Sequence, residues 1–225
     1  MLFRSTNRMV GAEALMRWSR DGKLIPPGDF IPLAEATGLI NHMSLWAIDE
    51  AARQAAECHR NFGFDASIAV NLPSRLFEQS DLVEKIEAIL LARQVPPRAI
   101  ELEITETGLM KDLQGVVPSL HRLNQLGTEI SIDDFGTGYS SLSYLTTLPI
   151  SELKIDRSFV RDLGDTPQSS AIVSAIIALA RALGLRVVAE GVEKLSQMEV
   201  LYNLGCHICQ GFLYARPMSP ADVER

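Results

Sequence analysis

Short runs of apolar residues alternate along the chain with longer segments whose apolar residues recur at helical spacing. The short runs are mostly continuous, as expected for parallel strands that are covered on both faces. They predict strands at Arg8–Met16, Ser67–Leu72, Ala99–Thr105, Glu129–Asp133, Ser151–Ile155, Arg186–Ala189 and Cys206–Gln210. The longer segments predict helices at Ser44–Phe62, Leu82–Ala92, Val116–Leu126, Ser169–Leu183 and Ser196–Leu204. Gly127, Gly184 and Gly205 each follow a predicted helix and precede a predicted strand, where a glycine commonly ends a helix.

The regular alternation of strand and helix, with no linker, predicts one α/β domain over residues 1–225 with mostly parallel strand pairing. A chain of 225 residues is just long enough for a (β/α)₈ barrel. The pattern yields seven strands, one fewer than that barrel needs. We therefore expect a modified TIM (β/α)₈ barrel with one N-terminal strand missing from this chain.

Composition and charge narrow the class of protein. Hydrophobic residues make up 47% of the chain and charged residues 22%, which excludes a disordered protein. The net charge of −7 argues against binding a DNA or RNA duplex through a basic surface. Three cysteines are too few for a disulfide framework and fit a reducing compartment. No signal peptide is visible, and the longest uncharged apolar segment, Thr166–Ala180, is too short to span a bilayer. We expect a cytoplasmic protein, or the cytoplasmic part of a larger, membrane-attached one.

Polar side chains stand at the carboxyl ends of six predicted strands, and one more acid, Glu13, lies within the first strand. These strand ends carry Asn71, Glu103 with Glu106, Asp133 with Asp134, Lys154 with Asp156, Glu190 with Glu193, and Gln210. In a (β/α)₈ barrel such positions form the active site. Ligands that are all oxygens suit a hard cation such as Mg²⁺ or Mn²⁺. The adjacent Asp133 and Asp134 fit two such ions, a common device for cleaving phosphodiesters, and Lys154 would contact the phosphate or the attacking water.

Seven blocks of sequence, in order and in register, identify a family. They are Glu-Ala-Leu-Met-Arg-Trp at 13–18, Val-Asn-Leu at 70–72, Glu-Leu-Glu-Ile-Thr-Glu-Thr at 101–107, Asp-Asp-Phe-Gly-Thr-Gly-Tyr-Ser-Ser at 133–141, Leu-Lys-Ile-Asp at 153–156, Ala-Glu-Gly-Val-Glu at 189–193 and Gln-Gly-Phe at 210–212. Together they resemble the EAL-domain cyclic di-GMP phosphodiesterases over essentially the whole chain. The resemblance implies a modified (β/α)₈ barrel and metal-dependent hydrolysis of one phosphodiester bond of cyclic di-GMP to linear pGpG.

The resemblance also implies a set of metal ligands and catalytic groups. Residues resembling the ligands of a first ion are Glu13, Asn71, Glu103 and Asp133. Asp133 and Asp134 resemble the ligands of a second ion. Glu190 resembles either another ligand of the second ion or the general base, and both roles stay open. Lys154 resembles the residue that orients the hydrolytic water.

Further positions resemble substrate contacts and a loop anchor. Leu15, Arg17 and Gln210 match substrate-binding positions, with Arg17 near a phosphate and Gln210 also supporting the metal ligands. Arg17 has a second interpretation, in which it pairs with a neighbouring carboxylate and only stabilises the barrel mouth. Glu106 resembles the anchor of the loop that begins at Asp134, which in this family often links activity to homodimer formation.

Two functions from different classes remain. The chain is either a hydrolase or a catalytically silent receptor that binds cyclic di-GMP and signals to a partner. Silent relatives typically lack a metal ligand or a loop residue, whereas every such position here is filled, so hydrolysis is favoured. Family members usually begin with a helix and strand ahead of the region matching Leu2–Val10, which again suggests a missing strand. Sensor or GGDEF-type cyclase domains upstream, in a longer protein, are expected partners.

Overall fold

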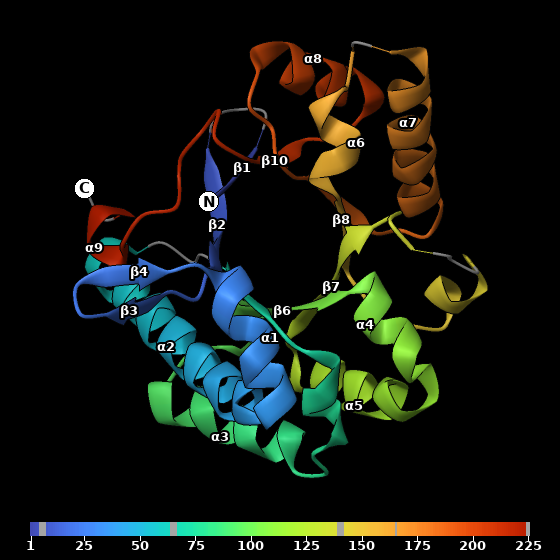
Figure 1. Ribbon diagram of the computed structural model, residues 1–225. Coiled ribbons are helices and arrows are strands. Elements are labelled where there is room, and N and C mark those ends of the chain that lie inside the picture. The colour runs from blue at the N-terminus through green and yellow to red at the C-terminus, as the bar shows by residue number, and fades with distance from the viewer. Residues whose placement is uncertain (5–7, 64–66, 139–141, 165, 224–225) are drawn as a thin grey trace.

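Eight strands close into a barrel in the part of the chain that the structure describes, and helices surround it (Figure 1). The structure is a computed structural model that describes residues 1–4, 8–63, 67–138, 142–164 and 166–223. The order around the barrel is β1 (Leu2–Arg4), β10 (Ile208–Gln210), β9 (Arg186–Ala189), β8 (Glu152–Ile155), β7 (Glu129–Phe135), β6 (Ile100–Thr105), β5 (Ser67–Asn71) and β2 (Met9–Ala14). The predicted (β/α)₈ barrel is therefore confirmed.

Strand β1 corrects the prediction that an N-terminal strand is missing. It pairs with β10 on one side and β2 on the other, antiparallel to both, while the remaining neighbours pair in parallel. The eighth strand thus lies at Leu2–Arg4, within the chain. Three residues are too few to show any periodicity, which is why the apolar pattern did not predict this strand.

Helices cover the outside of the barrel, and their bounds agree with the predicted helices to within a few residues where one was predicted. They are α1 (Pro27–Thr37), α2 (Leu39–Phe62), α3 (Leu82–Arg93), α4 (Glu106–Lys111), α5 (Leu113–Leu126), α6 (Arg157–Arg161), α7 (Pro167–Ala182), α8 (Leu195–Leu204) and α9 (Pro220–Val223). Short 3₁₀ helices lie at Ser74–Glu78, Pro97–Ala99 and Leu142–Thr146. No helix among the described residues is long and apolar enough to cross a membrane.

Two elements between β2 and α2 were not predicted. A hairpin of β3 (Trp18–Arg20) and β4 (Lys23–Ile25) turns at Asp21 and Gly22, both with positive φ, as a tight hairpin turn requires. Helix α1 begins with Pro27 and contains a second proline, Pro32. Because proline is rare inside helices, the sequence of this segment did not predict a helix. A proline at the first helical position is nevertheless compatible with a helix, since that N–H has no intrahelical partner.

Successive side chains of a barrel strand point alternately outward, toward the helices, and inward, into the barrel. On β6, Ile100, Leu102 and Ile104 join the apolar core that packs against the helices. Glu101 and Glu103 lie between them in sequence, so their side chains point to the other face of the strand. Glu103 contacts Lys154 on β8, which is not a neighbour of β6, so this other face is the barrel interior. The interior is therefore polar, and the apolar core lies outside it.

The interior carries an acid pair, Glu101 and Glu152, near the amino ends of the strands. Each is only 2% exposed. Burial and the adjacent Glu101 raise the pKa of Glu152 to about 8, although Arg186 partly opposes the shift. Because this pKa is higher in the folded chain than in the unfolded chain, folding favours the protonated Glu152.

We expect a pH-dependent stability from Glu152. Its contribution is fully present below the ordinary carboxyl pKa of the unfolded chain and is lost as pH rises through about 8. The loss amounts to a few kcal/mol at most, at about 1.4 kcal/mol per pKa unit. Unfolding free energies measured between pH 5.5 and 8.5 test this, and Glu152→Gln should flatten the slope. A matched Glu87→Gln variant on the exposed surface should keep it, and an unchanged slope in Glu152→Gln would contradict the assignment.

Candidate metal and catalytic site

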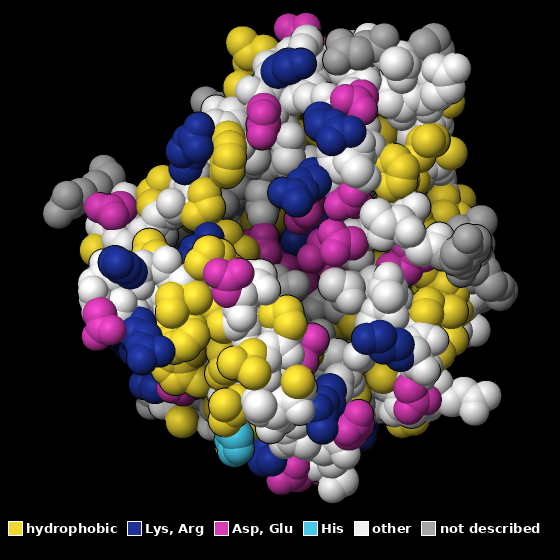
Figure 2. Space-filling view, in the orientation of Figure 1, with side chains coloured by type: hydrophobic (Ala, Val, Ile, Leu, Met, Phe, Trp, Pro, Cys, Tyr) yellow, Lys and Arg dark blue, Asp and Glu magenta, His cyan; other side chains and the backbone are white. Residues whose placement is uncertain are grey.

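Acidic side chains gather in a hollow at the centre of one face of the barrel (Figure 2). The residues predicted at the strand ends occur together at the carboxyl ends of the seven mutually parallel strands. They are Glu13 on β2, Asn71 on β5, Glu103 on β6, Asp133 and Asp134 on β7, Lys154 on β8, Glu190 directly after β9, and Gln210 on β10. The strand register explains this convergence, because parallel strands bring their carboxyl ends to one edge.

Lys154 occupies the centre of the cluster and is completely buried. Its Nζ lies 2.6 Å from Glu103 Oε1 and 2.6 Å from Glu190 Oε1. Asp133 Oδ1 is 3.5 Å away and Glu13 Oε2 is 3.8 Å away. Burial by itself would lower the pKa of Lys154, but these four carboxylates outweigh it and raise the pKa well above its ordinary value. The four carboxylates therefore favour the charged ammonium form of Lys154.

Amide side chains cross-link the acids on the other side of the cluster. The Asn71 Nδ2 donates to Glu13 Oε1 at 2.9 Å and to Glu103 Oε2 at 3.1 Å. The Gln210 Nε2 donates to Glu13 Oε2 at 2.5 Å. Since the amide nitrogen of Asn71 is used in this way, its carbonyl oxygen is the atom available to a cation. Gln210 touches the site through Glu13, which places it where it can orient that carboxylate.

Asp133, Asp134 and Glu190 form a second group in the same hollow. Each offers an oxygen, and these oxygens all lie within 4.8 Å of one another. Asp134 has a φ of 54°, in the left-handed region that aspartate tolerates better than most residues. Its backbone N–H donates to Asp133 Oδ1 at 2.9 Å. The turn of the chain at Asp134 thus brings the two consecutive carboxylates to the same site.

Burial, together with repulsion between neighbouring acids, raises the pKa values of three carboxyls in the cluster. Burial raises the pKa of Glu103 well above its ordinary value and that of Glu190 to about 7. Burial, Asp133 and a hydrogen bond with Asp156 raise the pKa of Asp134 to about 6. Each shift means that the ionised form is disfavoured unless positive charge is nearby.

The donor set fits divalent cations. Five carboxylates surround one ammonium group, an excess of four negative charges when all are ionised: Glu13, Glu103, Asp133, Asp134 and Glu190 around Lys154. Carboxylate and amide oxygens are the ligands that Mg²⁺ and Mn²⁺ prefer. Two divalent ions would neutralise this excess and favour the ionised carboxylates.

Glu106, the first residue of α4, holds the segment that follows β7. It is completely buried. Its Oε2 accepts from the Gly136 backbone N–H at 2.9 Å, and its Oε1 accepts from the Tyr144 hydroxyl at 3.4 Å. Gly136 is two residues after Asp134, so Glu106 fixes the chain just beyond the second group of acids. The loop anchor predicted from the sequence therefore contacts its loop at Gly136; residues 139–141 of that loop lie outside the described part of the chain.

We expect Glu106→Ala to weaken divalent-ion binding. The change removes the acceptor of the Gly136 N–H and so releases the backbone that positions Asp134. Groups that orient metal ligands are typically worth about 10- to 100-fold in metal affinity. Mn²⁺ titration followed by electron paramagnetic resonance measures the loss. Glu106→Gln keeps an oxygen that can accept from Gly136 and should lose less; equal Mn²⁺ affinity in all three proteins would show that Glu106 does not position the site.

Leu15 and Arg17 follow β2 at the rim of the barrel. Leu15 is 42% exposed, and Arg17 is also exposed. Arg17 Nη1 donates to the Met16 carbonyl at 2.9 Å. Among the residues that the structure describes, no carboxylate pairs with Arg17, so the interpretation of Arg17 as an ion-pair partner is not supported.

Asp156 is a site residue to which the sequence analysis gave no role. It lies just after β8, hydrogen-bonds with Asp134 and contributes to the raised pKa of that carboxyl. Its Oδ1 also accepts from the Ser158 backbone N–H at 2.9 Å, at the start of α6. The sequence feature that could have indicated a role for Asp156 is its position at a strand end, two residues after Lys154. The sequence places Asp156 there, but only the fold shows that β7 and β8 bring it to Asp134.

Comparison with known proteins gives consistent matches. A family model described as the EAL domain matches residues 3–217. The signaling protein YkoW of Bacillus subtilis is 47% identical over 219 residues, which cover 97% of this chain and 27% of YkoW. The bifunctional diguanylate cyclase/cyclic di-GMP phosphodiesterase MucR of Pseudomonas aeruginosa is 49% identical, covering 95% of this chain and 31% of MucR. The cyclic di-GMP phosphodiesterase PdeR of Escherichia coli is 40% identical, and the match covers 95% of this chain and 32% of PdeR. The chain thus spans about a third of the length of these relatives.

Solved structures match the whole barrel. The phosphodiesterase of PaMucR, in complex with c-di-GMP, superposes with a TM-score of 0.93 at 46% identity. The match covers 99% of this chain and 91% of that one. The fold of this chain is therefore shared with a solved structure over almost its full extent.

Proposed function

The chain belongs to the EAL domain family, and from this membership we propose that it hydrolyses one phosphodiester bond of cyclic di-GMP to give linear pGpG. The observation that carries the proposal is the cluster around Lys154, where every residue matched to a family ligand position occurs in one hollow. Relatives named cyclic di-GMP phosphodiesterases, and a matching structure that contains c-di-GMP, support the choice of substrate.

Two divalent ions, Mg²⁺ or Mn²⁺, are the cofactors that the donor set supports. The first would be held by Glu13, Asn71, Glu103 and Asp133. The second would be held by Asp133, Asp134 and Glu190. Such ions, when bound, polarise the phosphate and make a water molecule more acidic.

The side chains of the chain complete the site around the phosphate. Lys154 places a fixed positive charge among the acids, where it can hold the attacking water by a hydrogen bond and attract the phosphate. Arg17 is free of ion pairs within the described part of the chain and can contact a second phosphate. Leu15, at the rim, offers an apolar surface to a base. Glu190 either completes the second ion site or accepts the proton of the water, as it contacts Lys154 directly.

Hydrolysis is favoured over a silent receptor because no acid or amide of the site is replaced or displaced from the cluster. The test is chromatography of cyclic di-GMP after incubation with the chain in Mg²⁺ or Mn²⁺, beside a sample with EDTA. We expect a pGpG peak that requires the metal. Intact substrate in every sample, together with measured binding of cyclic di-GMP, would establish the receptor instead.

We also propose that this domain works as a homodimer in the cytoplasm, as part of a longer signalling protein with sensor or GGDEF-type cyclase domains. The lengths of MucR and PdeR, of which the chain covers about a third, support the larger context. Light scattering coupled to gel filtration, with and without cyclic di-GMP and Mg²⁺, tests the dimer. A monomer in both conditions would contradict it.

A further inference from the structure

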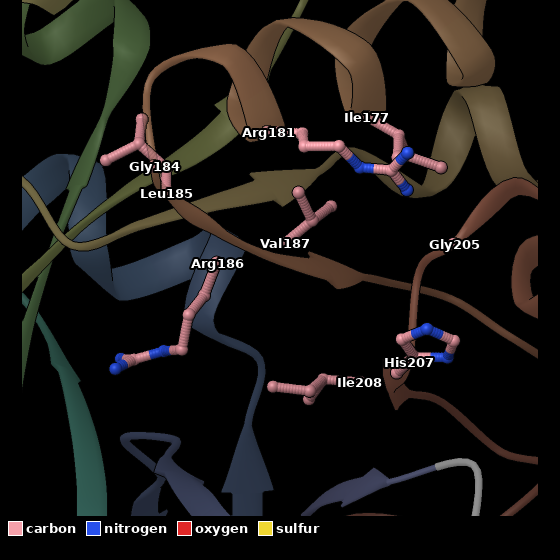
Figure 3. Close-up of a pocket in the computed structure, with 9 residues that line it drawn as sticks. All are labelled: Ile177, Arg181, Gly184, Leu185, Arg186, Val187, Gly205, His207 and Ile208. Atoms are coloured by element: carbon pink, nitrogen blue, oxygen red, sulfur yellow. The ribbon is translucent and has the colours of Figure 1, made fainter.

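The segment that follows β9, residues 190–194, carries Glu190 into the acid cluster and is closely packed. The two ends of β9 differ in this respect. At its amino end, the strand borders a pocket of about 340 Å³ beside α7 (Figure 3). At its carboxyl end, a single added carbon would not fit at Gly191, or at Gly211 just after β10. The packing is therefore tight at the end of β9 that carries Glu190.

The two glycines allow this packing on opposite sides of the segment. A Cβ atom at Gly211 would lie 2.2 Å from the Val192 carbonyl oxygen and 2.3 Å from its backbone nitrogen. A Cβ atom at Gly191 would lie 2.5 Å from Arg157 Cβ. Both distances are too short for non-bonded atoms, so only glycine lets the chains approach so closely. The Val192 N–H also donates to the Gln210 carbonyl at 3.0 Å. The backbone after β9 is thus fixed between the start of α6 and the end of β10.

Gln197, in the first turn of α8, ties the far end of the segment to α6. It is only 2% exposed. Its Oε1 accepts from the backbone N–H groups of Glu193 and Lys194 at 2.8 and 2.9 Å. Its Nε2 donates to the carbonyls of Val160 and Arg161 at 3.1 and 3.0 Å. All four partners are backbone groups outside α8, so this one buried amide joins two separate stretches of chain.

Helix α6 continues the connection to the acids on β7. The residue before it, Asp156, accepts from the Ser158 backbone N–H at 2.9 Å and hydrogen-bonds with Asp134. Asp134 and Glu190 belong to the group of three acids whose oxygens lie within 4.8 Å of one another. The Gln197 amide and α6 therefore link the backbone on one side of this group to the backbone on the other.

We propose that Gln197 is a positioning residue for the second divalent ion, because it fixes Glu190 relative to Asp134. The inference rests on the proposed two-ion site and deepens it. Gln197 acts only through backbone, since its four hydrogen bonds are with the segment after β9 and with α6. Without the amide, the N–H groups of Glu193 and Lys194 lose this acceptor and the segment is free to shift. The ligands proposed for the first ion lie on β2, β5, β6 and β7, which the amide does not contact.

Mn²⁺ titration of the full chain, followed by electron paramagnetic resonance, tests the proposal. Two Mn²⁺ ions that share the Asp133 carboxylate lie close enough for their spins to couple, so the second ion gives a distinct signal. Gln197→Met removes all four hydrogen bonds at nearly the same side-chain length. We expect it to weaken the second ion about tenfold or more, while the first ion binds as before. Gln197→Glu keeps an acceptor for both N–H groups and should show a smaller loss, again confined to the second ion.

The controls separate positioning from general stability. Asn203→Met, on an exposed position of α8, should bind both ions normally. Hydrogen exchange at the Glu193 and Lys194 amides should be faster in Gln197→Met, and urea unfolding without metal reports any overall loss of stability. A merely structural role for Gln197 would lower stability but leave the ratio of the two ion affinities unchanged.

Two outcomes overturn the proposal, and they differ in what else they refute. If the ratio of the two ion affinities in Gln197→Met and Gln197→Glu equals that of the unmodified chain, the positioning role is wrong and the two-ion site stands. Gln197→Glu carries the same comparison if Gln197→Met does not fold. If the unmodified chain never shows a coupled pair of Mn²⁺ ions, the two-ion site itself is refuted, and the positioning role with it.

Discussion

We expect replacement of Asp133 by asparagine to lower hydrolysis of cyclic di-GMP by about 10³-fold or more, while the barrel stays folded. Asp133 is the residue proposed to bridge both ions, and it also accepts from the Asp134 backbone N–H at 2.9 Å. Asparagine keeps the shape and can still accept that hydrogen bond, so the change removes charge rather than packing. Metal ions contribute several kcal/mol to such reactions, and each 1.36 kcal/mol is a factor of ten in rate.

Initial rates at saturating Mg²⁺ measure the effect, and circular dichroism checks that the barrel is intact. Asp29→Asn, an exposed acid in the first turn of α1, is the matched control and should react at the normal rate. Turnover near the unmodified rate in Asp133→Asn would show that the metal assignment is wrong.

Lys154→Met is expected to lower both the rate and the stability. The methionine is nearly as long as lysine but leaves Glu103, which is fully buried, without its ion pair at 2.6 Å. Breaking a buried ion pair by removing one partner typically costs about 3–5 kcal/mol. The rate should fall more than the substrate affinity, because Lys154 is proposed to act on the attacking water in the transition state.

Two measurements separate these effects. Urea unfolding without metal should show the full loss of stability, and added Mg²⁺ should restore part of it, since bound cations stabilise the folded chain and offset the acids. Single-turnover rates at saturating substrate give the catalytic loss. Lys23→Met, on the exposed hairpin, should leave both unchanged. If Lys154→Met unfolds like the unmodified chain in the absence of metal, the central role of this ammonium group is refuted.

The sequence predicted seven of the eight barrel strands because apolar residues recur along each of them, continuously in β5 and at alternate positions in β6. β5, β6 and β9 agree with their predicted ranges to within one residue at each end. The strand-end rule also predicted which side chains meet, since Asn71, Glu103 and Asp133 lie at the carboxyl ends of adjacent strands. Their roles as ligands stay predictions, because a pattern of acids indicates a cation only through the chemistry of the donors.

Other features depend on contacts between distant segments. β1 is a short antiparallel strand that only the pairing with β2 and β10 defines. The hydrogen bond of Asp156 with Asp134 depends on how β7 and β8 lie side by side. The acid pair Glu101 and Glu152 is 51 positions apart in sequence, on strands β6 and β8 that are not neighbours. No local pattern encodes their meeting across the barrel interior.

The most direct test of the account is the reaction run in ¹⁸O-labelled water with Mg²⁺ and analysed by mass spectrometry. Attack of water on one phosphorus breaks one P–O bond to a ribose and places the water oxygen on the new terminal phosphate. The account predicts pGpG that carries one ¹⁸O on that phosphate, formed with Mg²⁺ and absent with EDTA. Unlabelled pGpG, or cyclic di-GMP that stays intact in the presence of Mg²⁺, would contradict it.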